Sequence, residues 1–191
     1  ATGIATLSVV TSLMAAYALV YFQIKYASFF FWLIFITLLV PLELRIMPSY
    51  LVMSKLGLVN SYIGLILPIS ASAIATFFFR QFYKSIPEEL LEAAKLDGTG
   101  SWRFFVDFLI PLSKTMIAAV FIFMFVFGYN QYLWPLIMTT TEQYWTVVMG
   151  LKTMYGSISD RFAFVIMSMV PPIIIIIFLQ RWFIQGIFQN K

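Results

Sequence analysis

The chain has 191 residues, of which 62% are hydrophobic and 10% are charged, and its formal net charge is +4. These fractions lie far outside those of an ordinary soluble domain, so the composition places the chain in a lipid bilayer. Cysteine and histidine are both absent, which excludes thiolate chemistry, the usual zinc sites and the commonest general base. The basic residues form no stripe, so we expect no nucleic-acid partner. Because Cys and His are missing, we also expect no metal site.

Five apolar segments are long enough to cross a membrane, because a helical span needs about 20 such residues. Their predicted bounds are 3–22, 28–50, 61–82, 113–136 and 162–183. Runs such as "FFFWLIFI" have no two-residue alternation, which argues against strands. The sequence therefore predicts an all-α, polytopic membrane helix bundle with five transmembrane helices.

Two charged residues fall inside the second predicted span. At about 1.5 Å per residue from Phe29, Glu43 and Arg45 would be roughly 21 and 24 Å along one helix, within an apolar core about 30 Å thick. Ionisable residues at that depth usually face a watery path or a partner, and we expect Pro41 and Pro48 to distort the helix. Arg45 is a candidate contact for a phosphate or polar solute. The alternative is an arginine that reaches the outer headgroups or pairs with another subunit.

A charged passage separates the third and fourth spans. Ten of the twenty charged residues lie between Arg80 and Lys114, so this passage must be in water. If it is cytoplasmic and five spans alternate, eight Lys and Arg residues lie on the cytoplasmic side and four on the other. This distribution agrees with the positive-inside rule.

The same passage has the pattern of a helical hairpin, residues 83–112. Ser85 and Glu88 have the spacing of a capping box, so we expect Ser85 to cap a first amphipathic helix that has Ala94 on its apolar face. Gly98 is expected to take a positive φ, and Ser101 to cap a second, aromatic helix. The alternative is an interfacial loop with its aromatic rings among the headgroups.

Polar and aromatic residues are mixed near the end of the fourth span. Asn130, Gln131, Tyr132 and Trp134 are candidate contacts along a solute pathway, because amides beside aromatic rings commonly hold hydroxylated solutes. The alternative is an aromatic belt at the outer interface. The following stretch, 139–160, is expected to include a short helix on the outer surface.

The hairpin residues resemble the permease subunits of bacterial ATP-binding-cassette importers. Their signature is a cytoplasmic "EAA" loop, and five residues here stand at its spacing: Glu92, Ala93, Ala94, Gly98 and Pro111. The resemblance implies that these residues and Asp97 form the coupling site. Three stretches, "PLELRIMPSY", "FFRQFYKSIPEELLEAAKLDG" and "GYNQYLWPLI", are most similar to the carbohydrate-type permeases of the glycerol-3-phosphate branch. That subfamily has six spans, so we expect an N-terminal helix to be missing from residues 1–191, which otherwise form a single transmembrane domain.

The resemblance implies a multi-pass subunit of the bacterial inner membrane that pairs with a sibling permease. The hairpin would couple to two ATP-binding subunits, which would bind ATP and Mg²⁺, and an extracytoplasmic solute-binding protein would deliver the solute. The chain has no phosphate-binding loop of its own and is not expected to be an enzyme. The implied solute is glycerol-3-phosphate or a glycerophosphodiester, and the alternative is a neutral sugar or oligosaccharide.

Two other classes of membrane protein fit the sequence less well. An intramembrane enzyme would need catalytic groups at membrane depth, and the chain offers no His, no Cys and no pair of intramembrane Asp residues. An ion-driven secondary transporter commonly has internal repeats, and none is found here. The sequence therefore favours the importer permease.

Overall fold

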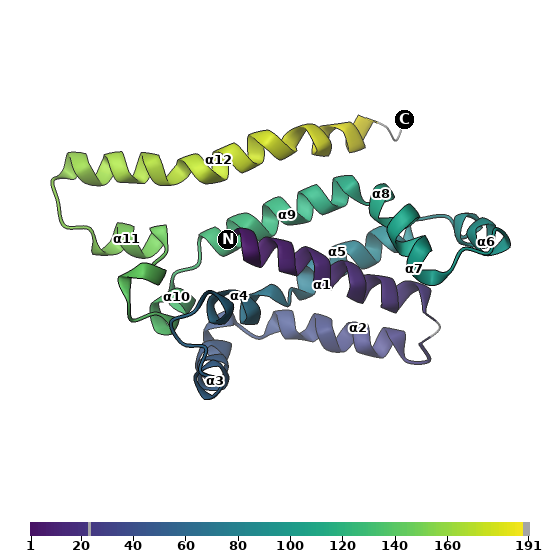
Figure 1. The fold of residues 1–191 in the computed structure, drawn as a ribbon, viewed down its shortest axis with the longest axis horizontal. Helices are drawn as coiled ribbons and strands as arrows, with labels where there is room; N and C mark the ends of the chain where they lie inside the picture. The colour runs from purple at the N-terminus through teal and green to yellow at the C-terminus, as the bar shows by residue number, and fades with distance from the viewer. Residues whose placement is uncertain (23, 189–191) are drawn as a thin grey trace.

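The computed structural model describes residues 1–22 and 24–188, with side chains as far as residue 180. Within these ranges all regular secondary structure is helical and no strand occurs, which confirms the predicted fold class. Figure 1 shows the hairpin helices α6 (Glu88–Leu96) and α7 (Ser101–Phe104) at one end of the bundle. At the opposite end lie α3 (Leu42–Lys55), α10 (Leu133–Met138) and α11 (Val147–Thr153).

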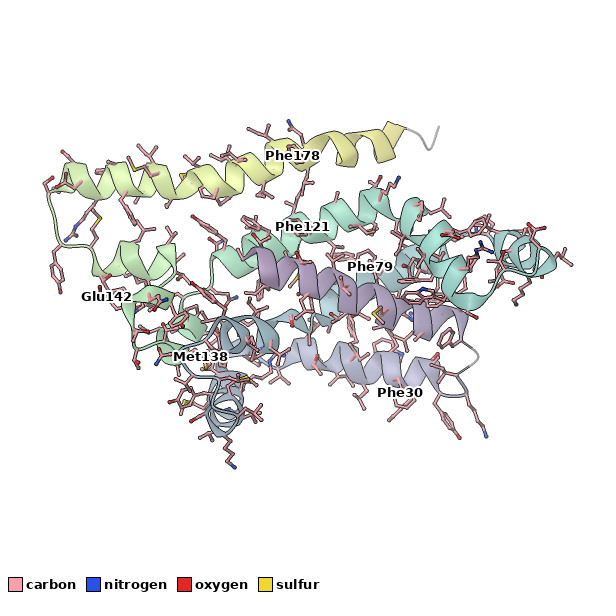
Figure 2. All side chains as sticks on the ribbon, viewed as in Figure 1. Phe30, Phe79, Phe121, Met138, Glu142 and Phe178 are labelled. Carbon is pink, nitrogen blue, oxygen red and sulfur yellow. The ribbon has the colours of Figure 1, made fainter. Side chains whose placement is uncertain are left out.

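Helix α1 (Thr2–Tyr21) is the centre of the bundle. It packs along α5 (Ala73–Lys84) and α9 (Lys114–Tyr129) and also meets α4 (Tyr62–Ser70). Gly128 of α9 allows a close approach, because a Cβ there would lie 3.2 Å from the side chain of Ile4. Figure 2 shows Phe79 of α5 where α1 crosses the bundle, and its side chain is fully buried. The first predicted span is thus one helix with a buried face.

The second predicted span is wrong as a single helix. Helix α2 (Ala27–Ile36) continues as a 3-10 turn, η1 (Thr37–Leu39), and the chain then bends by 104° into α3. Val40 and Pro41 are extended, with ψ of 113° and 141°, because proline lacks the N–H that would continue the helix and restricts the residue before it. Glu43 and Arg45 therefore lie on a separate helix and not at 21 to 24 Å along α2.

The third predicted span is also broken, into α4 and α5 with a 47° bend. The break frees backbone carbonyls, which need partners inside a membrane. Thr11 Oγ1 donates to the Ser70 carbonyl (3.4 Å), and Ser12 Oγ donates to the Ser72 carbonyl (3.2 Å). The hydroxyl of Ser72 accepts from the backbone N–H of Ala75 and caps α5. Polar residues of α1 thus support the break.

The two caps predicted in the hairpin are wrong. Ser85 ends α5 and donates its hydroxyl to the Phe82 carbonyl, and Pro87 precedes α6 without a side-chain cap. Ser101 is the first residue of α7, after Gly100. A π-helical turn, η2 (Phe105–Leu109), and the short α8 (Ile110–Leu112) follow, and the chain bends by 75° into α9.

The fourth predicted span extends past the end of its helix, whereas the fifth lies within one continuous helix. Helix α9 stops at Tyr129, so the segment expected to continue to residue 136 includes the separate helix α10. The stretch 139–160 includes a 3-10 turn, η3 (Glu142–Tyr144), and α11, so the predicted short helix is present. Helix α12 (Ile158–Phe188) runs without a break through Pro171 and Pro172.

The structure agrees with the prediction of five membrane spans only if each bent pair of helices is counted as one span. Within the described residues, α1 and the Ile158–Gln180 part of α12 are each long and apolar enough to cross a bilayer. Three bent helix pairs bring the number to five at most.

Candidate functional site

A cavity lies where the second and third spans are broken. Its volume is about 340 Å³, within the range of small-molecule sites. Pro41 and Arg45 line it from one break, and Ala71 and Ser72 line it from the other. The ring of Trp134 lies on α10 and closes another side. The prolines and small residues that interrupt the helices therefore also create the space between them.

Arg45 is the charged residue of this cavity. The remaining lining is apolar apart from the small hydroxyl groups of Thr37, Ser49 and Ser72. No carboxylate lines the cavity, and Glu43 is exposed elsewhere on α3. Within the described part of the chain, no hydrogen bond or salt bridge involves Arg45, since the one salt bridge joins Arg103 to Asp107. Arg45 is itself exposed, and its guanidinium has no partner among the described residues.

The four candidates after α9 are separated by the structure. Trp134 is buried, and its indole N–H donates to the Leu65 carbonyl (3.2 Å), so the ring is held against the α4 side of the cavity. Gln131 is buried outside the cavity lining, and Asn130 is exposed at the end of α9. The ring of Tyr132 lies under the Lys152 ammonium at 3.8 Å. Trp134 is thus the one of these four that shares the cavity with Arg45.

The hairpin presents a buried side and an exposed side. Ala94 is buried, whereas Glu92, Ala93 and Asp97 are exposed. Gly98 has a φ of +71°, as predicted, and no atom lies within 4 Å of a Cβ added there. Pro111 is exposed within α8.

Large apolar side chains on the hairpin face solvent. Leu96 is 89% exposed and Trp102 is 67% exposed. Exposed apolar side chains of this size beside charged residues are typical of surfaces that contact another protein or a membrane.

An aromatic cluster at the base of the hairpin was missed by the sequence reasoning. Tyr17 and Tyr21 of α1 contact Phe105 and Phe104, with ring centroids 4.9 and 5.5 Å apart. Tyr17 Oη donates to the Ser101 carbonyl at 2.7 Å. These contacts join residues more than 80 positions apart, so no local pattern announces them.

Two further polar residues were missed. The Arg80 guanidinium is 3.8 Å from the centroid of the Phe31 ring, a cation–π contact between α5 and α2. At the outer end, Asn60 has a φ of +55° and exchanges hydrogen bonds with Thr140: Nδ2 donates to Oγ1 (2.8 Å), and the Thr140 N–H donates to Oδ1 (2.7 Å). Asn60 thus ties the α3–α4 loop to the segment after α10.

No metal centre is built by the described residues, among which no group of three His, Cys, Asp or Glu side chains converges. The arrangement offers one lone cation in a mid-sized cavity and one projecting hairpin at the far end of the bundle.

Comparison with known proteins gives a family and several relatives. The profile of the family described as "Binding-protein-dependent transport system inner membrane component" matches residues 8–189. The sn-glycerol-3-phosphate transport system permease protein UgpE of Yersinia pestis bv. Antiqua (strain Antiqua) is 44% identical over 189 residues, which are 96% of this chain and 67% of the relative. The UgpE protein of Brucella melitensis biotype 1 is 45% identical, over 100% of this chain and 70% of its own length.

A solved structure shares the fold. It is described as a bacterial ABC transporter involved in the import of the acidic polysaccharide alginate. The TM-score is 0.78 at 24% sequence identity, and the match covers 94% of this chain and 71% of the other.

Proposed function

The chain belongs to the family of inner membrane components of binding-protein-dependent transport systems, and from this premise we propose that it forms half of the solute pathway of an ATP-driven importer of sn-glycerol-3-phosphate. It is a multi-pass permease subunit, and its sibling permease supplies the other half of the pathway. A glycerophosphodiester carries the same anionic group and belongs to the same proposed solute class.

The observation that carries the solute is the lone Arg45 guanidinium in the cavity between two broken spans. A phosphate monoester needs a cation with several donors, and the planar guanidinium offers paired donors to two oxygens. The relatives at 44% and 45% identity are named for sn-glycerol-3-phosphate, which supports the same chemistry here.

The cavity adds features that suit an anion with a hydroxylated body. Helices α3 and α5 both begin beside it, at Pro41 and Ser72, and helix N-termini favour negative charge. The hydroxyls of Thr37 and Ser49 are further polar groups of the lining. No carboxylate is among the lining residues that could compete with an anion for Arg45.

The hairpin has the role of the coupling element in this proposal. Glu92, Ala93 and Asp97 face outward with Leu96, while Ala94 packs inward. An exposed surface with both charged and apolar groups is suited to dock on a separate subunit. We assign ATP and Mg²⁺ to two such subunits, so this chain transmits the motion that hydrolysis produces and catalyses no reaction itself.

Alternating access follows from these assignments. A solute-binding protein delivers the solute at the end of the bundle where α3, α10 and α11 lie. Motion of the ATP-binding subunits against the hairpin then tilts the spans and opens the pathway to the cytoplasm.

The test is uptake of labelled glycerol-3-phosphate and labelled maltose by proteoliposomes containing the complete transporter. Arg45→Gln is expected to lower glycerol-3-phosphate uptake at least tenfold, as for loss of one charged hydrogen-bonding group. Arg161→Gln is the matched control, since Arg161 is exposed at the start of α12 and should leave uptake unchanged. If the transporter imports maltose instead, and Arg45→Gln leaves maltose uptake unchanged, the result would contradict the proposed solute and favour a neutral sugar.

A further inference from the structure

Helix α1 touches both functional regions of the molecule through polar contacts. At one point Ser12 Oγ donates to the Ser72 carbonyl, at the α4–α5 break that lines the large cavity. At another, Tyr17 Oη donates to the Ser101 carbonyl, immediately after the turn of the hairpin. Five residues of one helix, about 7.5 Å of rise, separate the two donors.

The contact with the hairpin combines packing with a fixed direction. Tyr17 is 8% exposed, and its ring lies 4.9 Å from that of Phe105. Tyr21 stacks edge-on against Phe104 at 5.5 Å. Aromatic pairs tolerate a range of offset and edge-to-face arrangements, whereas a hydrogen bond of 2.7 Å weakens steeply when its geometry changes. The Tyr17 hydroxyl therefore sets the register of the hairpin on α1.

The packing around this hydrogen bond is incomplete. A small cavity of about 70 Å³ lies between the end of α1 and the hairpin, lined by Tyr17, Tyr21, Ala94 and Thr99 among others. Space beside α6 lets its position vary if packing alone holds it. A directional bond to the turn removes that freedom.

We propose that α1 is the strut between the coupling hairpin and the solute cavity, with Tyr17 and Ser12 as the positioning residues at its two polar contacts. Motion of the hairpin pulls on α1 through Ser101 and Tyr17. Ser12 then carries the displacement to the carbonyl of Ser72 in the cavity wall. This inference rests on the proposed coupling role of the hairpin and assigns the residues through which that role reaches the solute.

The first test compares two tyrosine hydroxyls in the complete transporter. Tyr17→Phe keeps the ring and removes the bond to Ser101. Tyr129→Phe is the matched control, because Tyr129 Oη donates to the Ser168 carbonyl at 2.6 Å and joins α9 to α12, away from the hairpin. The measured quantity is the number of solute molecules imported per ATP hydrolysed in proteoliposomes supplied with the binding protein.

Tyr17→Phe is expected to lower this ratio roughly three- to tenfold while ATP hydrolysis continues, as for one net hydrogen bond. Ser12→Ala should lower it in the same direction, whereas Tyr129→Phe should stay within about twofold of the wild type. A merely structural role would lower hydrolysis and import together. A ratio in Tyr17→Phe equal to that of Tyr129→Phe would overturn the proposal.

A second measurement does not depend on the solute. The chain has no cysteine, so spin labels can be placed on Met14→Cys in α1 and Glu89→Cys in α6, both at exposed positions outside the proposed docking residues. In the assembled complex, Tyr17→Phe should broaden the distribution of distances between the labels, and Tyr129→Phe should not. An unchanged distribution in Tyr17→Phe contradicts the strut. A wild-type transporter that imports no glycerol-3-phosphate contradicts the proposed solute alone, because this distance measurement still decides the inference.

Discussion

Gly98, in the turn of the hairpin, allows a substitution whose structural cost is known in advance. Its φ is +71°, and a Cβ added there meets no atom within 4 Å. Gly57, at the end of α3, has a φ of +69° and the same empty surroundings. Because L residues in this conformation cost about 1–2 kcal/mol, Gly98→Trp and Gly57→Trp should lower the free energy of unfolding by the same amount.

The two tryptophan variants should differ in transport. Gly98 lies where the proposed ATP-binding subunit docks, so a bulky side chain there should abolish uptake while leaving the permease assembled. Gly57 follows α3, at the opposite end of the bundle from the hairpin, and Gly57→Trp should retain uptake within about threefold, as expected from a stability loss alone. Gly98→Asn provides a second control, because asparagine tolerates a positive φ and adds a small side chain.

Uptake and ATP hydrolysis are measured in proteoliposomes, and thermal unfolding of the complex is measured in parallel. The reasoning is refuted if Gly98→Trp transports as well as Gly57→Trp. It is also refuted if Gly98→Asn is as inactive as Gly98→Trp, because the loss of uptake would then not depend on the bulk of the side chain at the docking surface.

Two further predictions concern stability at the outer end. Asn60→Ala removes the two short hydrogen bonds with Thr140 and the two longer ones with Thr141, and it places a less suitable residue at a positive φ. It should cost about 2–3 kcal/mol and speed hydrogen exchange at the Thr140 N–H; unchanged exchange would contradict the contact. Gly64→Ala would push a Cβ into the Leu58 carbonyl oxygen and should cost about 1–3 kcal/mol in thermal unfolding, whereas Gly100→Ala, with open space around it, should cost under about 1 kcal/mol. Equal unfolding temperatures for these two alanine variants would show that the close approach at Gly64 does not restrict side-chain size.

The lengths of the apolar segments predicted where helices form, but not the angles at which the chain bends between them. Hydropathy records composition, and the residues on both sides of Pro41 are apolar enough for one span although the chain turns there by 104°. The proline was identified as a distortion, yet a sum over the window gives no angle. Arg45 lines the cavity but does not lie at the predicted depth along the second span, since it follows this turn.

Other parts of the site depend on contacts that no local pattern encodes. The hydroxyl of Ser85 matched a capping box, but a carbonyl three residues earlier, that of Phe82, takes its hydrogen bond. Tyr17 meets Ser101 only after α1 has packed against α5. Gly98 was predicted correctly because a helix end followed by Asp-Gly needs a positive φ in almost any context.

Helix α12 has a consequence for how the chain is assembled. Its Ile158–Gln180 window has a mean hydropathy of 2.7, and none of that window is buried inside the chain. It attaches to the bundle mainly along α9, with the hydroxyl of Tyr129 on the Ser168 carbonyl. Such a helix enters the bilayer on its own hydrophobicity and needs no earlier helix to stabilise it. The exposed segment around Tyr155 therefore serves mainly to keep α12 near α9. We expect that two separately synthesised pieces of the chain, divided at this segment, can reassociate in the membrane.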